Sequence, residues 1–152
     1  MGDETRFEVL TEYIFHNFPN VRKIADVAGG MFGHLNISLT KCGYDVTTID
    51  PRFGYRDYNC YGMGVPYHEN MASAFDLIVG LHPDGATESI VYSANFKPII
   101  IVPCCNHWEG ERYGRYKRNI VLTIRNYLEE NDIQFEEGKL LMSGANEYFR
   151  TF

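Results

Sequence analysis

The sequence lacks the features that mark membrane proteins and secreted proteins. No apolar run approaches the roughly 20 residues that a helix needs to span a bilayer. The chain leads from Met1 to Asp3 and Glu4 without the basic start and apolar block of a signal peptide. Only four cysteines are present, and the adjacent pair Cys104 and Cys105 gives no disulfide framework. We therefore expect a cytoplasmic protein without a membrane segment.

Positive charge is also scarce, with 14 Lys and Arg residues against 20 Asp and Glu residues and a net charge of −6. Because phosphate neutralisation drives nucleic-acid affinity, an acidic chain binds long nucleic acids poorly unless its cations are clustered. One such cluster lies in residues 112–128, where Arg115, Arg118 and Arg125 would share one helix face. These cations could hold a few phosphates of an RNA, but a solvated helix face explains them equally well.

Length and hydrophobic pattern predict a single α/β domain. A chain of 152 residues suits one domain with one core. The pattern predicts a helix at 3–18, a strand at 21–27, a helix at 34–42, strands at 44–49, 65–68 and 75–81, a helix that begins within 82–88 and ends at 97–98, a strand at 99–102, a helix at 115–131 and a hairpin within 133–152. Gly43 is expected to end the second helix in a left-handed conformation. The hairpin turn is expected at residues 143–146.

Residues 24–52 combine two acids with a glycine-rich turn. Asp26 ends one apolar run, and Asp50 ends the next. The turn after the first acid consists mainly of small residues: Ala28, Gly29, Gly30 and Gly33. Glycines let a backbone turn tightly and approach a ligand closely, and an acid at the end of the second strand can accept hydrogen bonds from ribose hydroxyls. The stretch therefore predicts a nucleoside-binding β-turn-α-β unit.

These residues resemble motifs I and II of class I S-adenosylmethionine (SAM)-dependent methyltransferases. The first motif of that family places glycines at the second, fourth and often sixth positions after the acid, where this sequence has Ala28, Gly30 and Phe32. The resemblance implies a Rossmann-like, seven-stranded, mainly parallel sheet with helices on both faces and an antiparallel C-terminal hairpin. It also implies SAM as the cofactor, bound by Asp26, Ala28, Gly29, Gly30, Gly33, Asp50, Pro51, Asn70, Met71, Gly80 and Leu81.

Two other function classes stay open. Ala28, Gly30 and Gly33 also fit a degraded dinucleotide fingerprint, which would predict a nicotinamide-nucleotide-binding module. Asp26 argues against it, because a pyrophosphate needs amide donors and the positive end of a helix. Dehydrogenases also usually need a further substrate domain, for which no chain is left. The second alternative is a non-catalytic, methyltransferase-like SAM-binding subunit that works with a partner subunit or as a homo-oligomer, which the small size makes credible.

The ends of the expected fourth and fifth strands resemble a narrower group, the tRNA 2′-O-methyltransferases with a Cys-Cys-His-His signature. After the fourth strand, residues 80–87 resemble the His-containing, Ala-Thr-bearing strand end of that group, with Pro83-Asp84 where a Cys-Gly pair is usual. After the fifth strand, Cys104, Cys105 and His107 match the signature, whereas Asn106 replaces its first histidine. The resemblance implies that these three residues face the substrate, and RNA is then one candidate acceptor. Arg115 and Arg118 belong to the same substrate side. The Asn-Pro-Pro-Tyr type motif of amino-methylating enzymes is absent, which disfavours methylation of adenine N6.

His82 and Asp84 are the candidate catalytic residues. A histidine titrates near neutrality and can accept a proton from an acceptor hydroxyl or amine. The competing interpretation is that His82 hydrogen-bonds the backbone and shapes its loop. For Asp84, the alternative to a catalytic role is the N-cap of the following helix, where Glu88 also favours the helix start through its charge.

Cys104, Cys105 and His107 offer ligand types that zinc prefers, but their spacing argues against a metal. Structural zinc sites usually separate their cysteines by two to four residues, and adjacent side chains in extended chain point to opposite faces. The sequence therefore predicts no metal and favours a cysteine pair packed beneath the cofactor crevice.

Overall fold

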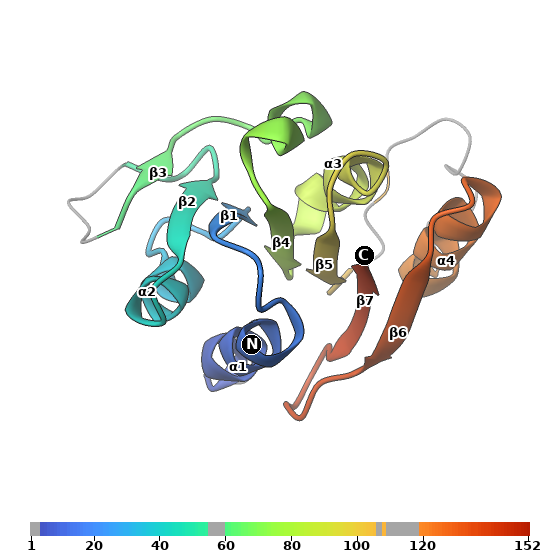
Figure 1. The fold of residues 1–152 in the computed structure, drawn as a ribbon, viewed down its shortest axis with the longest axis horizontal. Helices are drawn as coiled ribbons and strands as arrows, with labels where there is room; N and C mark the ends of the chain where they lie inside the picture. Colours follow the sequence, from blue (N-terminus) through green and yellow to red (C-terminus); the bar gives the residue numbers. More distant parts are fainter. Residues whose placement is uncertain (1–3, 55–59, 106–107, 109–118) are drawn as a thin grey trace.

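The computed structural model describes residues 4–54, 60–105, 108 and 119–152 (Figure 1). Its elements follow one another in this order: α1 (Arg6–Asn17), β1 (Lys23–Val27), α2 (His34–Lys41), β2 (Asp45–Ile49), β3 (Gly62–Met63), the 3-10 helix η1 (Glu69–Ala74), β4 (Leu77–Leu81), the 3-10 helix η2 (Asp84–Ala86), α3 (Thr87–Ser93), β5 (Ile99–Val102), α4 (Ile120–Glu130), β6 (Phe135–Lys139) and β7 (Glu147–Thr151).

The described strands form one sheet in the order β3-β2-β1-β4-β5-β7-β6. The first five strands of this order run parallel, and β7 pairs antiparallel with both β5 and β6. The predicted seven-stranded, mainly parallel sheet with an antiparallel C-terminal hairpin is therefore confirmed. The chain order reverses between β1 and β4, which is where open α/β sheets bind ligands outside the carboxyl ends of their strands.

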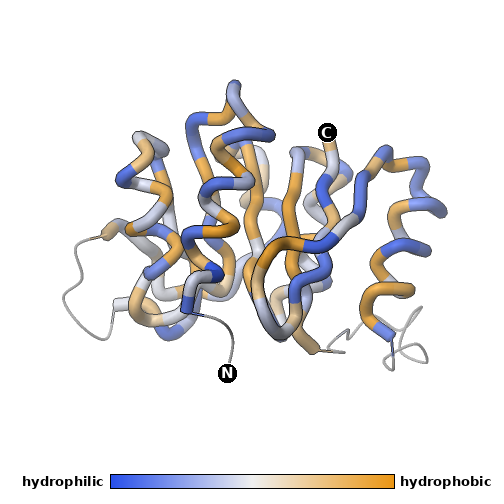
Figure 2. The backbone as a smooth tube through the Cα atoms, turned by 90° about the horizontal axis from the view of Figure 1, so that it is seen from below, coloured by the Kyte–Doolittle hydropathy of each residue, from blue (hydrophilic) through white to orange (hydrophobic). Residues whose placement is uncertain are grey.

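Helices cover both faces of the sheet because the strands bury apolar side chains in both directions. On one face, α1 and α2 pack against alternate strand residues such as Val79 and Ile100. On the other face, α3 and α4 pack against the residues between them, such as Ile78 and Ile101. Figure 1 shows these three layers, and in Figure 2 the helices alternate hydrophobic and hydrophilic residues along their length. An uninterrupted apolar run such as Ile99–Val102 is typical of a strand buried on both faces.

Most expected elements lie within a few residues of their predicted bounds, and Gly43 has the expected left-handed conformation, with a φ of 93°. The third strand is an error of the prediction. It was expected at 65–68 but lies at Gly62–Met63, because a two-residue strand has no periodicity to detect. The last helix begins at Ile120, where the side chain of Asn119 caps it by accepting from the Leu122 amide. Residues 115–118, which were expected to open that helix, lie outside the described part of the chain.

The described helices are short, and none combines the length and apolar character that a membrane crossing requires.

Candidate functional site

Two cavities lie at the carboxyl ends of the parallel strands. The first has a volume of about 210 Å³ and is lined by Arg6, Phe7, Asp26, Ala28, Gly29, Gly30, Phe32, His34, Leu35, Arg52, Leu81 and His82. The second has a volume of about 290 Å³ and is lined by Ala28, Ile49, Asp50, Pro51, Arg52, Pro66, Tyr67, Pro83, Asp84, Gly85 and Ala86. They share Ala28 and Arg52, and together they fall within the range of about 300–1,000 Å³ that is typical of small-molecule sites.

Asp26 brings an unpartnered acceptor to the first cavity. Its carboxylate is buried at the end of β1, where the Thr48 hydroxyl donates to Oδ2 at 3.0 Å. Oδ1 has no hydrogen-bond partner among the described residues. Burial raises the pKa of Asp26 to about 7, the Thr48 hydrogen bond lowers it, and the charge of Asp50 raises it further. A buried carboxylate of this kind suits a ligand that carries a cationic or strongly donating group.

The turn after Asp26 needs glycine for two different reasons. At Gly29, an added Cβ would overlap the Asp26 carboxylate, so the backbone can pass over the acid only without a side chain. Gly30 has a left-handed φ of 79°, and a Cβ there would meet no described atom within 4 Å. The space beside Gly30 belongs to the first cavity, which Gly29 and Ala28 also line. Gly33 lines neither cavity in the described structure. It is the N-cap of α2 and has a left-handed φ of 60°.

Asp50 reaches the second cavity from the end of β2, but its oxygens are already engaged. The Gly30 amide donates to Oδ2 at 2.9 Å, and the Arg52 amide donates to Oδ1 at 2.8 Å. The Arg52 guanidinium adds contacts of 3.1 Å and 2.9 Å to the two oxygens. Burial alone would raise the pKa of Asp50, but the hydrogen bonds from Arg52 and Gly30 outweigh it and lower the pKa. A ligand hydroxyl must therefore displace Arg52 to reach this carboxylate.

His82 follows β4 with a left-handed φ of 52° and lines the first cavity beside Leu81. Its Nε2 lies 2.8 Å from the Ala145 carbonyl oxygen in the turn of the C-terminal hairpin. A carbonyl only accepts, so Nε2 carries the proton and Nδ1 is the basic atom of the neutral ring. Gly80, which was also expected to contact the cofactor, lines neither cavity; a Cβ there would press on Ile90 of α3.

Asp84 is not the N-cap that the sequence suggested. The N-cap of α3 is Ala86, without a side-chain hydrogen bond, and Asp84 instead opens η2 with a φ of 45°. The extra 3-10 turn before α3 moves the cap position two residues along the chain. The Asp84 carboxylate accepts from the thiols of Cys104 at 3.1 Å and Cys105 at 3.4 Å.

The two cysteines do not point to opposite faces, because the chain is no longer in a strand after Val102. Both Sγ atoms and the Asp84 carboxylate lie within 4.8 Å of one another. Partial burial and the hydrogen bond to Asp84 raise the pKa of Cys104 to about 12. The other substrate-side candidates, His107, Arg115 and Arg118, lie outside the described residues.

Two of the expected cofactor-binding residues lie away from the two cavities. Asn70 and Met71 lie in η1, and neither is among the described residues that line the two cavities. Pro66 and Tyr67 line the second cavity in their place. The expectations also missed Arg52. Its position two residues after Asp50 is close enough in the sequence for an ion pair with that acid to be considered.

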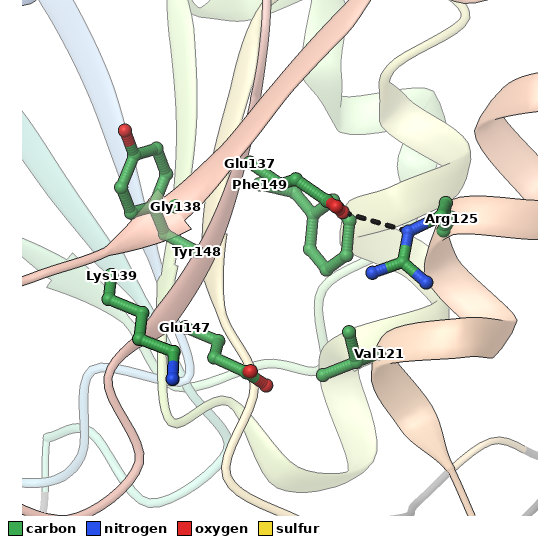
Figure 3. Close-up of a pocket in the computed structure, with 8 residues that line it drawn as sticks. All are labelled: Val121, Arg125, Glu137, Gly138, Lys139, Glu147, Tyr148 and Phe149. Carbon is green, nitrogen blue, oxygen red and sulfur yellow. Dashed lines mark hydrogen bonds and ion pairs between the residues drawn. The ribbon is translucent and has the colours of Figure 1, made fainter.

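A third cavity of about 210 Å³ lies between α4 and the hairpin β6-β7 (Figure 3). Arg125 and Glu137 form an ion pair of 3.0 Å in its wall, which Figure 3 marks with a dashed line. The guanidinium of Arg125, one of the clustered cations in the sequence, is therefore committed to a carboxylate. None of the candidate catalytic or cofactor-binding residues lines this cavity.

No protein-family model and no curated protein sequence matches the chain. Solved structures do. Magnesium protoporphyrin IX methyltransferase from Synechocystis PCC 6803, with bound SAM, matches with a TM-score of 0.60 and 15% identity over 96% of this chain and 76% of its own. A candidate methyltransferase of an antibiotic biosynthesis pathway from Anabaena variabilis matches with a TM-score of 0.56 and 18% identity over 86% of this chain.

An O-methyltransferase family protein from Burkholderia thailandensis matches with a TM-score of 0.54 and 11% identity over 95% of this chain. The chain spans only 63% of the Anabaena protein and 55% of the Burkholderia protein. At these identities the likeness concerns the fold, which is the Rossmann-like fold of class I SAM-dependent methyltransferases.

Proposed function

We propose that this chain is a SAM-dependent methyltransferase domain that binds its cofactor across the first and second cavities. One observation carries the proposal. The unpartnered carboxylate oxygen of Asp26 and the carboxylate of Asp50 border two adjoining cavities on either side of the Ala28–Gly30 turn. This arrangement occurs on a fold shared with methyltransferases whose structures contain SAM or its product SAH.

The residues suit the chemical groups of SAM. Asp26 would accept hydrogen bonds from the cationic amino group, and its pKa of about 7 would fall in the presence of that charge. Asp50 would accept from the ribose hydroxyls once Arg52 has moved aside, beside Pro51 in the same wall. The open space at Gly30 would let the cofactor lie against the backbone. Leu81 supplies an apolar wall to the first cavity.

SAM supplies a methyl group on a sulfonium centre, so the protein has to align an acceptor and remove a proton. His82 is the side chain best placed for the proton, since it lines the first cavity with Nε2 held by Ala145 and Nδ1 as its basic atom. The hydrogen bond to Ala145 would fix the ring plane. Asp84 lines the neighbouring cavity and would face the acceptor side rather than the cofactor.

RNA is the acceptor class that we put forward first. The support is the resemblance of residues 80–87 and 103–107 to tRNA 2′-O-methyltransferases, together with the cations of residues 112–118. Residues 106–107 and 112–118 lie outside the described structure, so this choice of acceptor rests on the sequence. Methyl transfer to RNA fragments that falls steeply with added salt, and with Arg115 and Arg118 replaced, would support this choice over a small-molecule acceptor.

Calorimetry with SAM and with NAD tests the cofactor. We expect the wild-type chain to bind SAM and not NAD. Asp50→Ala should weaken SAM at least about tenfold, because it removes charge-assisted hydrogen bonds to the ribose. Asp45→Ala is the matched control, since Asp45 is an exposed acid at the other end of the same strand, and it should leave the affinity unchanged within about twofold. Equal SAM affinity in wild type and folded Asp50→Ala would refute the assignment.

A further inference from the structure

Three metal-ligating side chains converge where β4 and β5 end. The Asp84 carboxylate and the Sγ atoms of Cys104 and Cys105 all lie within 4.8 Å of one another. One carboxylate oxygen, Oδ1, is 3.1 Å from one sulfur and 3.4 Å from the other. Asp84 and Cys104 are exposed, so an ion can reach the cluster from solvent.

The fold itself brings the donors together. Strands β4 and β5 are parallel neighbours, and their final residues, Leu81 and Val102, lie opposite each other in register. Asp84 follows β4 by three residues, and Cys104 follows β5 by two. The cluster therefore joins two strand ends that the sheet holds side by side, which gives it a rigid base.

The spacing also matches a known coordination geometry. In a tetrahedral zinc site, Zn–S bonds of about 2.3 Å and Zn–O bonds of about 2.0–2.2 Å place the ligand atoms roughly 3.5–3.8 Å apart. The two sulfur–oxygen distances of 3.1 Å and 3.4 Å need to open only by a fraction of an ångström, and the two sulfurs, which lie within 4.8 Å of each other, need to approach by about 1 Å at most. An ion at the centre would replace the thiol protons that now point at the carboxylate. Thiolate ligands favour a thiophilic cation over Mg²⁺ or Ca²⁺.

We propose that Asp84, Cys104 and Cys105 form a binding site for a thiophilic divalent cation such as Zn²⁺. Three protein ligands leave one tetrahedral position for a water molecule or another donor, as in sites that do chemistry rather than purely structural ones. Because Asp84 also lines the second cavity, the ion lies at the border of that cavity. This proposal departs from the expectation of no metal, which rested on the usual spacing of zinc-binding cysteines and on the divergence of neighbouring side chains in extended chain; the second premise does not hold here. The site is independent of whether the chain binds SAM.

The test is a Cd²⁺ titration of the reduced protein, followed by the ultraviolet thiolate-to-cadmium charge-transfer band, with Zn²⁺ as competitor. Wild type should bind one Cd²⁺ per chain, and Zn²⁺ should displace it. Cys104→Ser and Cys105→Ser should each lose about half of the band and at least about tenfold in affinity, because each removes one thiolate ligand. Asp84→Asn should keep the band and lose affinity.

Cys42→Ser is the matched control. Cys42 is an exposed free cysteine that follows α2, away from the cluster, so its loss should change neither the band nor the affinity. Circular dichroism establishes that each variant is folded. The proposal is wrong if the folded, reduced wild type gives no cadmium band, or if Cys42→Ser reduces the band as much as Cys104→Ser. A failure of SAM binding in separate calorimetry would leave the metal result unaffected.

Discussion

Arg52 closes the carboxylate of Asp50 by a two-pronged ion pair, with Nε 3.1 Å from Oδ1 and Nη2 2.9 Å from Oδ2. The acid is almost fully buried, with 2% of its side chain exposed, whereas the Arg52 side chain is 61% exposed. The exposed Arg52 side chain therefore covers the buried Asp50 carboxylate and occupies its two oxygens. In the SAM complex that we propose, a ribose would compete with Arg52 for the same two oxygens.

Arg52→Ala should therefore tighten SAM binding. Ion pairs with an exposed partner contribute about 0.2–1 kcal/mol, so removing the competitor should lower the dissociation constant by a factor of about 1.4 to 5. Calorimetry of wild type, Arg52→Ala and Arg52→Lys measures the effect, and the lysine variant should fall between the other two because it cannot make the two-pronged contact. Weaker binding by Arg52→Ala would mean that Arg52 contacts the ligand instead of competing with it.

Asp26→Asn should stabilise the ligand-free protein at alkaline pH. Burial raises the pKa of Asp26 from 3.8 to about 7, so its contribution to stability is complete below pH 3.8 and is lost as the pH rises through about 7. Asparagine has no charge to bury at any pH. The free energy of unfolding of the variant relative to wild type should grow between pH 4 and pH 8, by up to roughly 4 kcal/mol. Urea unfolding across this pH range measures it.

Asp76→Asn is a control with the opposite sign. Hydrogen bonds from the amides of Lys23 and Arg22 lower the pKa of Asp76, so its contribution to stability is present at neutral pH and is lost in acid. This variant should be destabilised at pH 7 and match wild type in strong acid. A stability difference for Asp26→Asn that does not vary between pH 4 and pH 8 would contradict the assigned pKa.

Gly29→Ala should be destabilising because the three atoms nearest to the added Cβ all belong to the Asp26 carboxylate. The added Cβ overlaps the Asp26 carboxylate, and overpacking of this kind costs about 1–3 kcal/mol. In an Asp26→Ala background the overlap is removed, so the same substitution should cost much less. Gly30→Ala adds a Cβ in open space at a left-handed φ and should cost about 1–2 kcal/mol in both backgrounds. Urea unfolding of the variants in this double-mutant cycle measures the loss of unfolding free energy. An equal loss for Gly29→Ala in both backgrounds would refute the contact with Asp26.

The order and type of most elements could be predicted because their signals are local. Buried strands are continuous apolar runs, as in Ile99–Val102, and α2 lies between Gly33 and Gly43, which both have left-handed φ angles. β3 was misplaced because only two residues pair with β2. The C-terminal hairpin was recognisable from strand-like segments on both sides of a turn.

A motif pointed to several of the residues that line the two cavities, such as Asp26, Gly30 and Asp50, but not to their contacts. The sequence contains Asp50 and Arg52 two positions apart, yet only the structure gives the direction of the guanidinium. The convergence of Cys104 and Cys105 depends on how the chain leaves β5, which periodicity does not encode. Long-range contacts such as that between His82 and Ala145, which are 63 positions apart, likewise have no local signal.

His82→Ala should reduce methyl transfer while leaving SAM affinity within a few-fold of wild type. If Nδ1 accepts the proton of the acceptor, its loss should cost about 10²–10⁴ in turnover. His82→Asn should recover little, because the amide restores polarity without a basic atom. His82→Gln should recover equally little turnover, although its longer amide can take the place of Nε2 as the donor to the Ala145 carbonyl. The measurement is transfer of radiolabelled methyl groups from SAM to RNA fragments and to small-molecule fractions. His16→Ala is the control, since His16 is an exposed histidine on α1 with 66% of its side chain exposed.

The His82 variants also distinguish a role of His82 as proton acceptor from a purely structural role. The hydrogen bond from Nε2 to Ala145 links the end of β4 to the turn of the hairpin. If His82 has only this structural role, its loss should lower the free energy of unfolding as well as turnover. In that case His82→Ala should lose thermal stability and SAM affinity together, and His82→Gln should restore part of both. Loss of turnover in a His82→Gln protein that keeps wild-type stability and SAM affinity leaves basicity at Nδ1 as the property that transfer requires.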